Sequence, residues 1–381
     1  MDISRLALRD GAAGRGRGAG SGSVFYSLAW GLLTVALLVL LAMDLGAPGP
    51  FAALGALTAA VSTSVWVDAS IAELHTATMA VSVAILLFAL RFGRSGSRGD
   101  LLWLTFVLTQ GVFHQRSVVV LTPAVVVLMA PHLLDIFRMG WRTWALVIGV
   151  ALLAPLTYLY LPLRVWTGAD WVFGSLGTWD GFWSLFFDNR ADRIFDMQTA
   201  WAGRIQTTLD ILNDDMWLPL LIAGYSGCGF LFWTAVPNRQ PASNPMDSPA
   251  LSGFLVSLGL TLVWLLQSIA DSPHLARPRN RCPVGSEVAG GTAGLCWAGV
   301  VLGWLYRHWA WSAVVAALGL AGVLVFWVVQ TRPFVLSITR DDSTQALVET
   351  VDRVPRDSLT APRRLQCPGD RLLDAYLCPG I

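Results

Sequence analysis

The sequence predicts an all-α membrane protein, a polytopic bundle of roughly nine to eleven transmembrane helices with a large extracytoplasmic loop and a short polar tail. Two observations predict this class. Apolar residues make up 55% of the 381 residues and charged residues only 13%, with a mean hydropathy of +0.58, whereas soluble domains carry about 25% charged residues. The apolar residues also gather in runs of about 20, the length that crosses a bilayer core about 30 Å thick.

The charged residues and cysteines narrow the chemistry. All 26 basic residues are arginines, so mechanisms that need a lysine amine, such as a Schiff base, are excluded. The 25 acidic residues nearly balance them, and no field of one sign indicates nucleic acid as a partner. The five cysteines lack the paired spacing of a metal site, so we expect no metal and no cofactor. We interpret them as free thiols, with a Cys367–Cys378 disulfide as the alternative.

Apolar runs place the expected spans. The clear candidates are residues 24–43, 69–92, 144–163, 216–236, 251–270, 294–306 and 309–329. A shorter run, 51–66, is a further candidate. The run 101–130 is interrupted midway by polar residues that include His114, Gln115 and Arg116. One straight helix would place that arginine in the middle of the bilayer, so we expect two short helices that meet at a polar turn.

Arginines near the helix ends predict the orientation, because short arginine-rich loops stay in the cytoplasm. One such loop contains Arg91, Arg94 and Arg98, and a second contains Arg138 and Arg142. The turn between these loops is then extracytoplasmic, as are the loop at residues 165–215 and the polar tail at 331–381. The transmembrane domain is expected over residues 24–330, after a disordered Gly/Arg-rich segment at residues 1–23.

Ionisable residues among apolar helices are costly, so each is a candidate functional residue. Three groups are predicted to meet on the outer side: Trp66, Asp68, Glu73 and His75; His114, Gln115 and Arg116; and Arg164 with Trp171, Trp179 and Asp180. Glu73 and His114 are the candidate catalytic residues, and the others are candidate substrate-binding residues. The spacing allows Asp68 and Glu73 to face one cleft, where an arginine and a histidine beside a carboxylate can bind a phosphate and a hydroxyl. The alternative is a structural ion pair between Glu73 and Arg116.

The predicted outer loop is rich in both aromatic and acidic residues. Between residues 182 and 197 the apolar side chains recur at helical intervals, which predicts a helix lying in the membrane interface. Aromatic faces beside carboxylates also suit sugar rings. A simple belt of interfacial aromatic residues is the alternative.

Three stretches resemble the motifs of one family of membrane proteins. Residues 62–75 resemble its Ser-x-x-x-Trp…Ala-x-x-x-Glu-Val-Tyr stretch, and residues 110–116 (Gln-Gly-Val-Phe-His-Gln-Arg) resemble its Gly-Leu-x-x-Gly-(His/Asn)-His segment. Residues 158–164 (Tyr-Leu-Tyr-Leu-Pro-Leu-Arg) resemble its Tyr-x-Tyr-Leu-Pro-Leu-Arg helix end, the most specific of the three. The family, long described as a domain of unknown function, is similar to protein O-mannosyltransferases of the GT-C class of glycosyltransferases.

The resemblance implies a GT-C-like sugar transferase in a bacterial plasma membrane. The implied donor is a polyprenyl-phosphate-linked sugar, and the implied acceptor is a protein or glycan hydroxyl. Arg116 or Arg164 would hold the donor phosphate, while Glu73 and His114 would serve acid–base chemistry or contact the acceptor. A transporter or flippase for a lipid-linked or small polar substrate is the alternative, although we find no internal repeat of the kind common in transporters.

Two departures from the family predict a truncated and inactive copy. The family's Gly-Asp-x-Gly-Glu-Phe loop and His-Pro-Pro-Gly-Tyr-Pro segment do not occur in this sequence. The arginines of residues 1–23 agree with that prediction, because one more helix before residue 24 would be needed to keep them in the cytoplasm. In addition, residues 273–297 and 361–381 break the apolar pattern as an out-of-register translation would.

Overall fold

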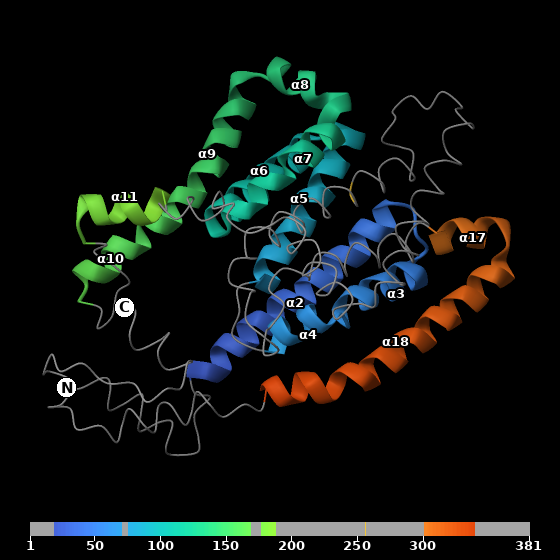
Figure 1. Ribbon diagram of the computed structural model, residues 1–381. Helices are drawn as coiled ribbons and strands as arrows, with labels where there is room; N and C mark the ends of the chain where they lie inside the picture. The colour runs from blue at the N-terminus through green and yellow to red at the C-terminus, as the bar shows by residue number, and fades with distance from the viewer. Residues whose placement is uncertain (1–18, 71–74, 169–176, 188–255, 257–300, 340–381) are drawn as a thin grey trace, which may run out of the picture. The chain divides into compact units, whose positions relative to one another are not determined.

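The structure is a computed structural model that describes residues 19–70, 75–168, 177–187, 256 and 301–339. Every regular element in these residues is a helix, which confirms the all-α class (Figure 1). Five stretches are long and apolar enough to cross a membrane: Val24–Asp44, His75–Ser95, Val118–Arg138, Trp141–Trp166 and Ala310–Ser337. By helix length and composition, the chain is therefore a multi-pass membrane protein. Several other predicted spans lie wholly or largely outside the described residues, so the total number of spans stays a prediction.

In chain order the helices are α2 (Ala19–Asp44), α3 (Gly49–Ala60), α4 (Thr63–Ser70), α5 (His75–Ser95), α6 (Arg98–His114), η1 (Arg116–Leu121), α7 (Thr122–Met129), η2 (Ala130–His132), α8 (Leu133–Arg138), α9 (Trp141–Tyr158), α10 (Tyr160–Trp166), α11 (Trp179–Phe187), α17 (Leu302–His308) and α18 (Ala310–Thr339). The two η elements are short 3-10 helices. The described residues up to Val335 belong to one compact unit, and the described part of a second unit is only the end of α18.

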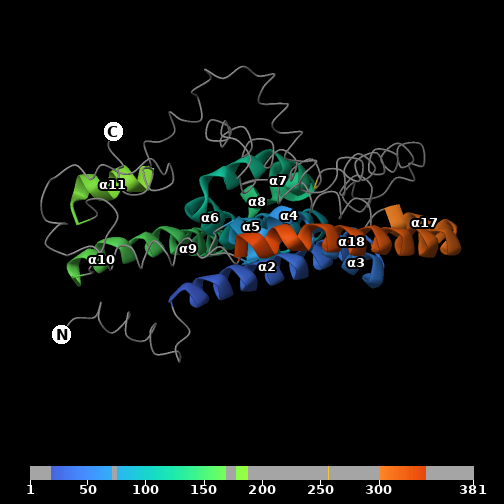
Figure 2. The ribbon, with the colours of Figure 1, turned by 60° about the horizontal axis from the view of Figure 1, so that its bottom comes forward.

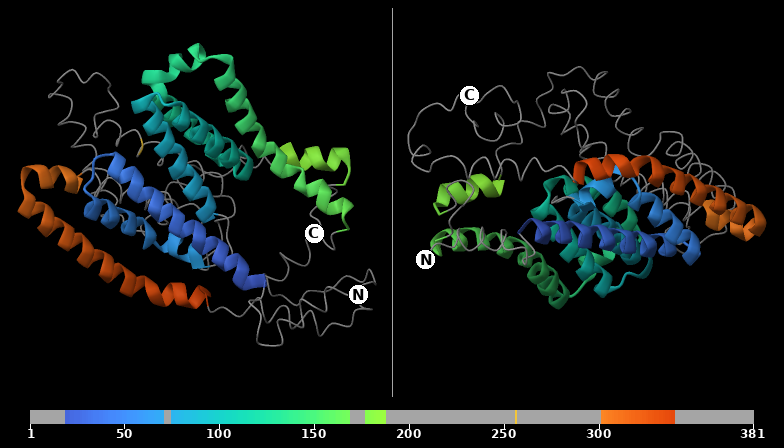
Figure 3. Two further views of the ribbon diagram at one scale, coloured as in Figure 1. Left: turned by 180° about the vertical axis from the view of Figure 1, so that it is seen from behind. Right: turned by 90° about the horizontal axis from the view of Figure 1, so that it is seen from below.

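Helices α2 and α5 are parallel neighbours at the centre of the packed helices (Figures 1 and 3). At the start of α5 and in the first half of α2, the Thr76 hydroxyl donates to the Ser27 carbonyl at 3.1 Å. Near their last turns the Arg91 guanidinium donates to the Asp44 carboxylate at 2.6 Å. Between them α3 and α4 return the chain, with a break in the helix at residues 61–62.

Helix α6 runs back beside α5 and ends at a break in the chain. At Gln115 the backbone is extended, with φ −144° and ψ 111°, and η1 and α7 follow. This geometry confirms two short helical segments that meet at a polar turn. The returning segment packs on the last turns of α5, where the rings of Phe92 and His132 meet edge to face at 6.2 Å.

Most arginines of the described helices lie at one end of the bundle, here called the arginine end. Arg91 and Arg94 both contact Asp44 at the end of α2. The Phe92–His132 contact brings the start of α8 to the same end, and Arg307 of α17 donates to the Gly46 carbonyl at 2.9 Å. The two loops expected on the cytoplasmic side therefore share one end, and the turn with His114 lies at the other, the His114 end.

Helix α9 faces outward along most of its length, and its exposed surface is built of leucine and isoleucine side chains. Exposed aromatic rings stand near its two ends, Trp141 at the arginine end and Tyr160 just beyond its last turn. These residues are 19 positions apart, which corresponds to about 28 Å of helix and matches a bilayer core of about 30 Å. Their placement is typical of the aromatic belts at the two membrane surfaces.

Helix α18 is one continuous helix that packs on α3 (Figure 2). Its buried Leu320 and Leu324 belong to a small apolar cluster against which Leu54 and Val61 pack, and just before it Tyr306 meets Phe51 edge to face at 5.6 Å. The outward face of α18 is apolar between two exposed residues of the kinds found at membrane surfaces, Trp311 at its start and Arg332 near its end.

Two domain boundaries differ from the prediction. Helix α2 begins at Ala19, so residues 19–23 are helical rather than disordered, because an apolar helix extends into neighbours of weak propensity once it has formed. Helix α18 runs to Thr339, past the expected boundary at residue 330. The cause is an apolar stretch after Pro333, in which Val335 is buried and continues the packed face.

Two element predictions are also corrected. The span expected over residues 69–92 begins as α5 only at His75, and residues 69–70 belong to α4. The interfacial helix expected over 182–197 begins earlier, at Trp179, because the Thr178 hydroxyl accepts from the Gly181 backbone N–H at 3.1 Å and caps it. Its expected continuation from residue 188 lies outside the described residues.

Candidate functional site

Helices α2, α5 and α6 form an apolar groove with a volume of about 470 Å³. The lining residues recur every three or four positions on each helix, so one face of each helix borders the groove. They are Tyr26, Trp30, Leu33 and Leu37 on α2; Ala77, Ala80, Val81, Ala84 and Phe88 on α5; and Trp103, Phe106, Val107, Gln110 and His114 on α6. The alanines of α5 leave the space that the larger side chains of α2 and α6 surround.

The groove is elongated along the helices. Its lining extends over residues 26–37, 77–88 and 103–114, an advance of eleven positions on each helix. At a rise of 1.5 Å per residue this advance gives a length of about 16 Å, roughly half of a bilayer core. A groove of this length matches one leaflet rather than a path across the whole membrane.

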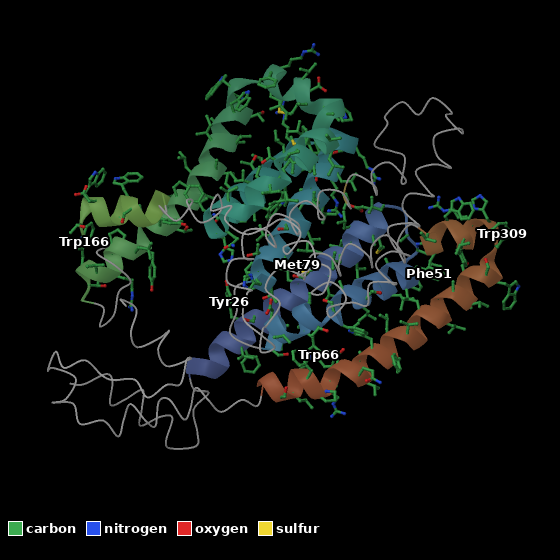
Figure 4. The ribbon with its side chains drawn as sticks, in the orientation of Figure 1. Tyr26, Phe51, Trp66, Met79, Trp166 and Trp309 are labelled. Atoms are coloured by element: carbon green, nitrogen blue, oxygen red, sulfur yellow. The ribbon has the colours of Figure 1, made fainter. Side chains whose placement is uncertain are left out.

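The two ends of the groove differ in chemistry. Toward the arginine end, the rings of Phe88 and Trp103 stack with 5.8 Å between their centroids. At the His114 end, the polar groups are those of Tyr26, Gln110 and His114 (Tyr26 is labelled in Figure 4). This distribution suits a molecule that has an apolar chain and a polar head, with the head beside His114.

The turn that carries His114 is held by α9. The Tyr158 hydroxyl donates to the Phe113 carbonyl at 2.7 Å, and the two rings meet edge to face at 5.5 Å. This carbonyl belongs to the last turn of α6, where carbonyl groups have no partner within the helix. The bond joins two of the motif stretches, because Phe113 lies in residues 110–116 and Tyr158 opens the Tyr-Leu-Tyr-Leu-Pro-Leu-Arg stretch at residues 158–164.

The described members of the first predicted group do not line the groove. On α4, Asp68 is only 5% exposed and Trp66 is half buried (Figure 4), and neither lines the groove. The neighbouring Ser62 is fully buried, and its hydroxyl has no hydrogen-bond partner among the described residues. His75 is half buried at the start of α5. Glu73 lies outside the described residues, so its predicted cleft with Asp68 stays untested.

The described members of the third predicted group are exposed. Arg164 lies in the last turn of α10, and Trp179 and Asp180 lie in the first turn of α11. Within the described part of the chain, no hydrogen bond or ion pair joins the Arg164 side chain to the His114 turn. Trp171 and the side chain of Arg116 fall outside the described residues.

Metal binding has no candidate in the described ranges, where no three His, Cys, Asp or Glu side chains gather closely enough to hold an ion. No family model, curated protein or solved structure matches this chain. The resemblance to the O-mannosyltransferase-like family therefore remains an expectation that depends on the sequence motifs.

Sequence reasoning missed the groove, although its signal is present. Tyr26, Trp30, Leu33 and Leu37 follow one another at spacings of four, three and four, a single face of α2. In a soluble protein, an apolar face with this spacing predicts the side of the helix that packs in the core. In a membrane span the same spacing does not stand out from the sequence, because the other faces of the helix are apolar as well.

Proposed function

We propose that this protein is a membrane glycosyltransferase that moves a sugar from a polyprenyl-phosphate donor to a hydroxyl of a protein or glycan. The groove of α2, α5 and α6 carries this proposal, since it is apolar along its length and has Gln110 and His114 at one end. A prenyl chain is apolar throughout and ends in a phosphate. In the groove, its chain would contact the α5 alanines and its head would lie near His114.

The reaction needs few groups from the protein. The acceptor oxygen attacks the anomeric carbon, the bond from that carbon to the phosphate oxygen breaks, and polyprenyl phosphate leaves. The hydroxyl proton passes to a base, for which His114 and Glu73 are the candidates. Arg116 and Arg164 are candidates for the phosphate, because a guanidinium pairs with two phosphate oxygens at once. Further candidate contacts to donor or acceptor are Trp66, Asp68, His75, Gln115, Trp171, Trp179 and Asp180.

A second candidate function is transport or flipping of a lipid-linked or small polar substrate. It is favoured by the break between α3 and α4, where buried Ser62 and Asp68 lie beside an interrupted helix. Interrupted helices with polar residues in the membrane interior are typical of transporter binding sites. The matching break in a second, repeated half that transporters show has no counterpart in the sequence.

Sugar transfer in membranes tests the proposal directly. Membranes that contain the chain are given a polyprenyl-phosphate donor with a radiolabelled sugar, and labelled protein or glycan is measured. Replacing Ala84 by Leu fills the groove and is expected to lower transfer at least tenfold. The control is Ala36→Leu, on the exposed side of α2, with expected transfer within twofold of the unmodified chain.

Uptake of the same donor and of free sugar into vesicles is measured in parallel. Uptake without transfer, lost in Asp68→Asn, would establish the transporter instead. If neither activity occurs in a chain that inserts normally, the inactive-copy prediction holds and the transferase proposal fails for this sequence.

A further inference from the structure

Three alanines of α5 lie at regular depths along the groove. Ala77, Ala80 and Ala84 are all buried and line it. The larger side chains of Val81 and Phe88 line it between and beyond them. At a rise of 1.5 Å per residue the alanines are about 4.5 and 6 Å apart along the helix. This wall of the groove therefore leaves extra room at three depths, about 5 Å apart.

The facing wall on α6 shows which depth lies nearest to each end. A β-carbon on Gly111 would lie 2.7 Å from Cγ1 of Val81. Farther along, the rings of Phe88 and Trp103 stack with 5.8 Å between their centroids. The two helices are therefore antiparallel along the groove, and His114 is level with the first turns of α5. From there to the stacked rings the groove is about 16 Å long.

The groove is open along its side, but stacked rings obstruct its far end. The lining side chains of Tyr26, Leu33 and Trp103 are 46%, 43% and 56% exposed. A chain longer than the groove can leave through this side into the lipid. The Phe88–Trp103 stack lies one helical turn beyond Ala84, in the path of a chain that continues straight on.

An isoprenoid chain matches these dimensions. It carries one methyl branch in each isoprene unit, and each unit adds four bonds to the chain. An extended chain advances about 1.2 Å per bond, so its branches recur about every 5 Å. From Ala77 to Ala84 the helix advances about 10.5 Å, two such repeats. With a head group beside His114, three units occupy about 15 Å, the distance to the stacked rings.

Shape is the property by which such a groove can select its ligand. The acyl chains of the surrounding bilayer are as apolar as a prenyl chain, so apolarity alone favours neither. An unbranched chain of the same length leaves the room at the alanines unfilled. Atoms that line unfilled space lose their dispersion contacts, so the branched chain is bound more tightly.

We propose that Ala77, Ala80 and Ala84 make the groove selective for a methyl-branched chain. Each alanine receives the branch of one of the first three isoprene units, and the Phe88–Trp103 stack directs the rest of the chain out into the bilayer. The proposal rests on the proposed function, which places the donor chain in this groove, and adds which part of that chain the protein recognises.

The test measures binding of prenyl monophosphates without a sugar to the full chain in nanodiscs, by displacement of a radiolabelled three-unit compound. Chains of two, three and four isoprene units are compared with an unbranched twelve-carbon alkyl phosphate, which has the main-chain length of three units. We expect affinity to rise about threefold from two units to three, and less than about 1.5-fold from three to four. The unbranched compound should bind at least about threefold more weakly than the three-unit compound.

Two variants change the groove at defined depths. Ala84→Val fills the deepest of the three positions and should weaken binding of the three-unit compound at least about threefold, with the two-unit compound within about 1.5-fold. Trp103→Ala removes half of the stack, so a fourth unit should then raise affinity as the third does. The control Ala36→Val, on the exposed side of α2, should change the affinity of none of these compounds.

The comparison of compounds on the unmodified chain decides the proposal even if a variant does not fold. Equal binding of the branched and unbranched chains would overturn the selectivity, and a continued rise with the fourth unit would overturn the limit of three. Sugar transfer is measured in the same nanodiscs. The expected order of binding without transfer contradicts the transferase alone, whereas transfer without that order contradicts only the selection by the alanines.

Discussion

Helices α5 and α9 are similar in hydropathy but occupy opposite environments. Their most apolar stretches have mean hydropathies of 1.8 and 2.0, yet 83% of that stretch is buried in α5 and only 6% in α9. The difference lies in side-chain size. Helix α5 is rich in Ala, Ser, Thr and Gly, which allow close approach of neighbouring helices, whereas α9 presents Leu and Ile outward. Hydropathy alone therefore does not distinguish a packed span from an outward-facing one.

The largest expected effect concerns glycine at these two helices. A β-carbon added to Gly93 of α5 would overlap the carbonyl oxygen of Leu128, a backbone atom that cannot move alone. We expect Gly93→Ala to cost about 3 kcal/mol of stability. Gly149 of α9 has no atom within 4 Å of such a carbon, so Gly149→Ala should be neutral or slightly stabilising. Thermal unfolding midpoints in detergent measure the stability of both variants. Equal midpoints for the two variants would contradict the difference in packing between α5 and α9.

A smaller effect is expected from leucine truncation. Leu86 of α5 is fully buried, while Leu152 of α9 is 56% exposed. In a membrane the alternative environment of a leucine side chain is lipid, which is as apolar as the protein interior, so burial contributes little free energy. The cost of Leu86→Ala is therefore mainly that of the cavity it leaves, about 2 kcal/mol. Lipid fills the space left by Leu152→Ala, which should change stability by less than about 0.5 kcal/mol. Chemical denaturation in mixed micelles compares the two variants, and a larger loss at Leu152 would show that α9 is covered by protein.

The smallest expected effect concerns the attachment of α9 to the His114 turn. Tyr158→Phe removes the hydroxyl that donates to the Phe113 carbonyl, and should cost about 1 kcal/mol. Tyr160→Phe is the matched control, because Tyr160 is exposed at the start of α10. Hydrogen exchange at residues 113–118 should rise in the first variant alone. Unchanged exchange there would mean that packing, and not the hydroxyl, fixes the turn.

The helix class and the break near Gln115 could be predicted from sequence, because they depend on local properties. Apolar runs fix where a helix can cross a bilayer, and a charged residue in the middle of such a run forces a turn. Arginine positions likewise predicted that the loops near Arg91 and Arg138 share one end. Each of these inferences uses only a window of about 20 residues.

The arrangement of the candidate site could not be predicted in the same way. Asp68 is buried on α4 instead of lining the groove, because the break after Ala60 changes which face of the next helix points inward. The groove itself depends on alanines of α5 meeting rings from α2 and α6, a contact between helices that no single window contains. Thr178 is a residue type that often caps a helix, but it predicts the start of α11 only once the position of that helix is known.

The aromatic spacing on α9 has a consequence for where this protein can reside. Trp141 and Tyr160 bracket about 28 Å of apolar helix, whereas Trp311 and Arg332 bracket 21 positions of α18, about 32 Å. Both helices cross the same bilayer, so one of them meets a hydrophobic mismatch of a few ångströms wherever the protein sits. The longer helix can tilt, whereas the shorter one requires a thinner bilayer around it, flanking side chains that reach to the interface, or association with a second copy, at a fraction of a kcal/mol per ångström. By these lengths we expect α9 to favour a bilayer slightly thinner than the one that α18 favours.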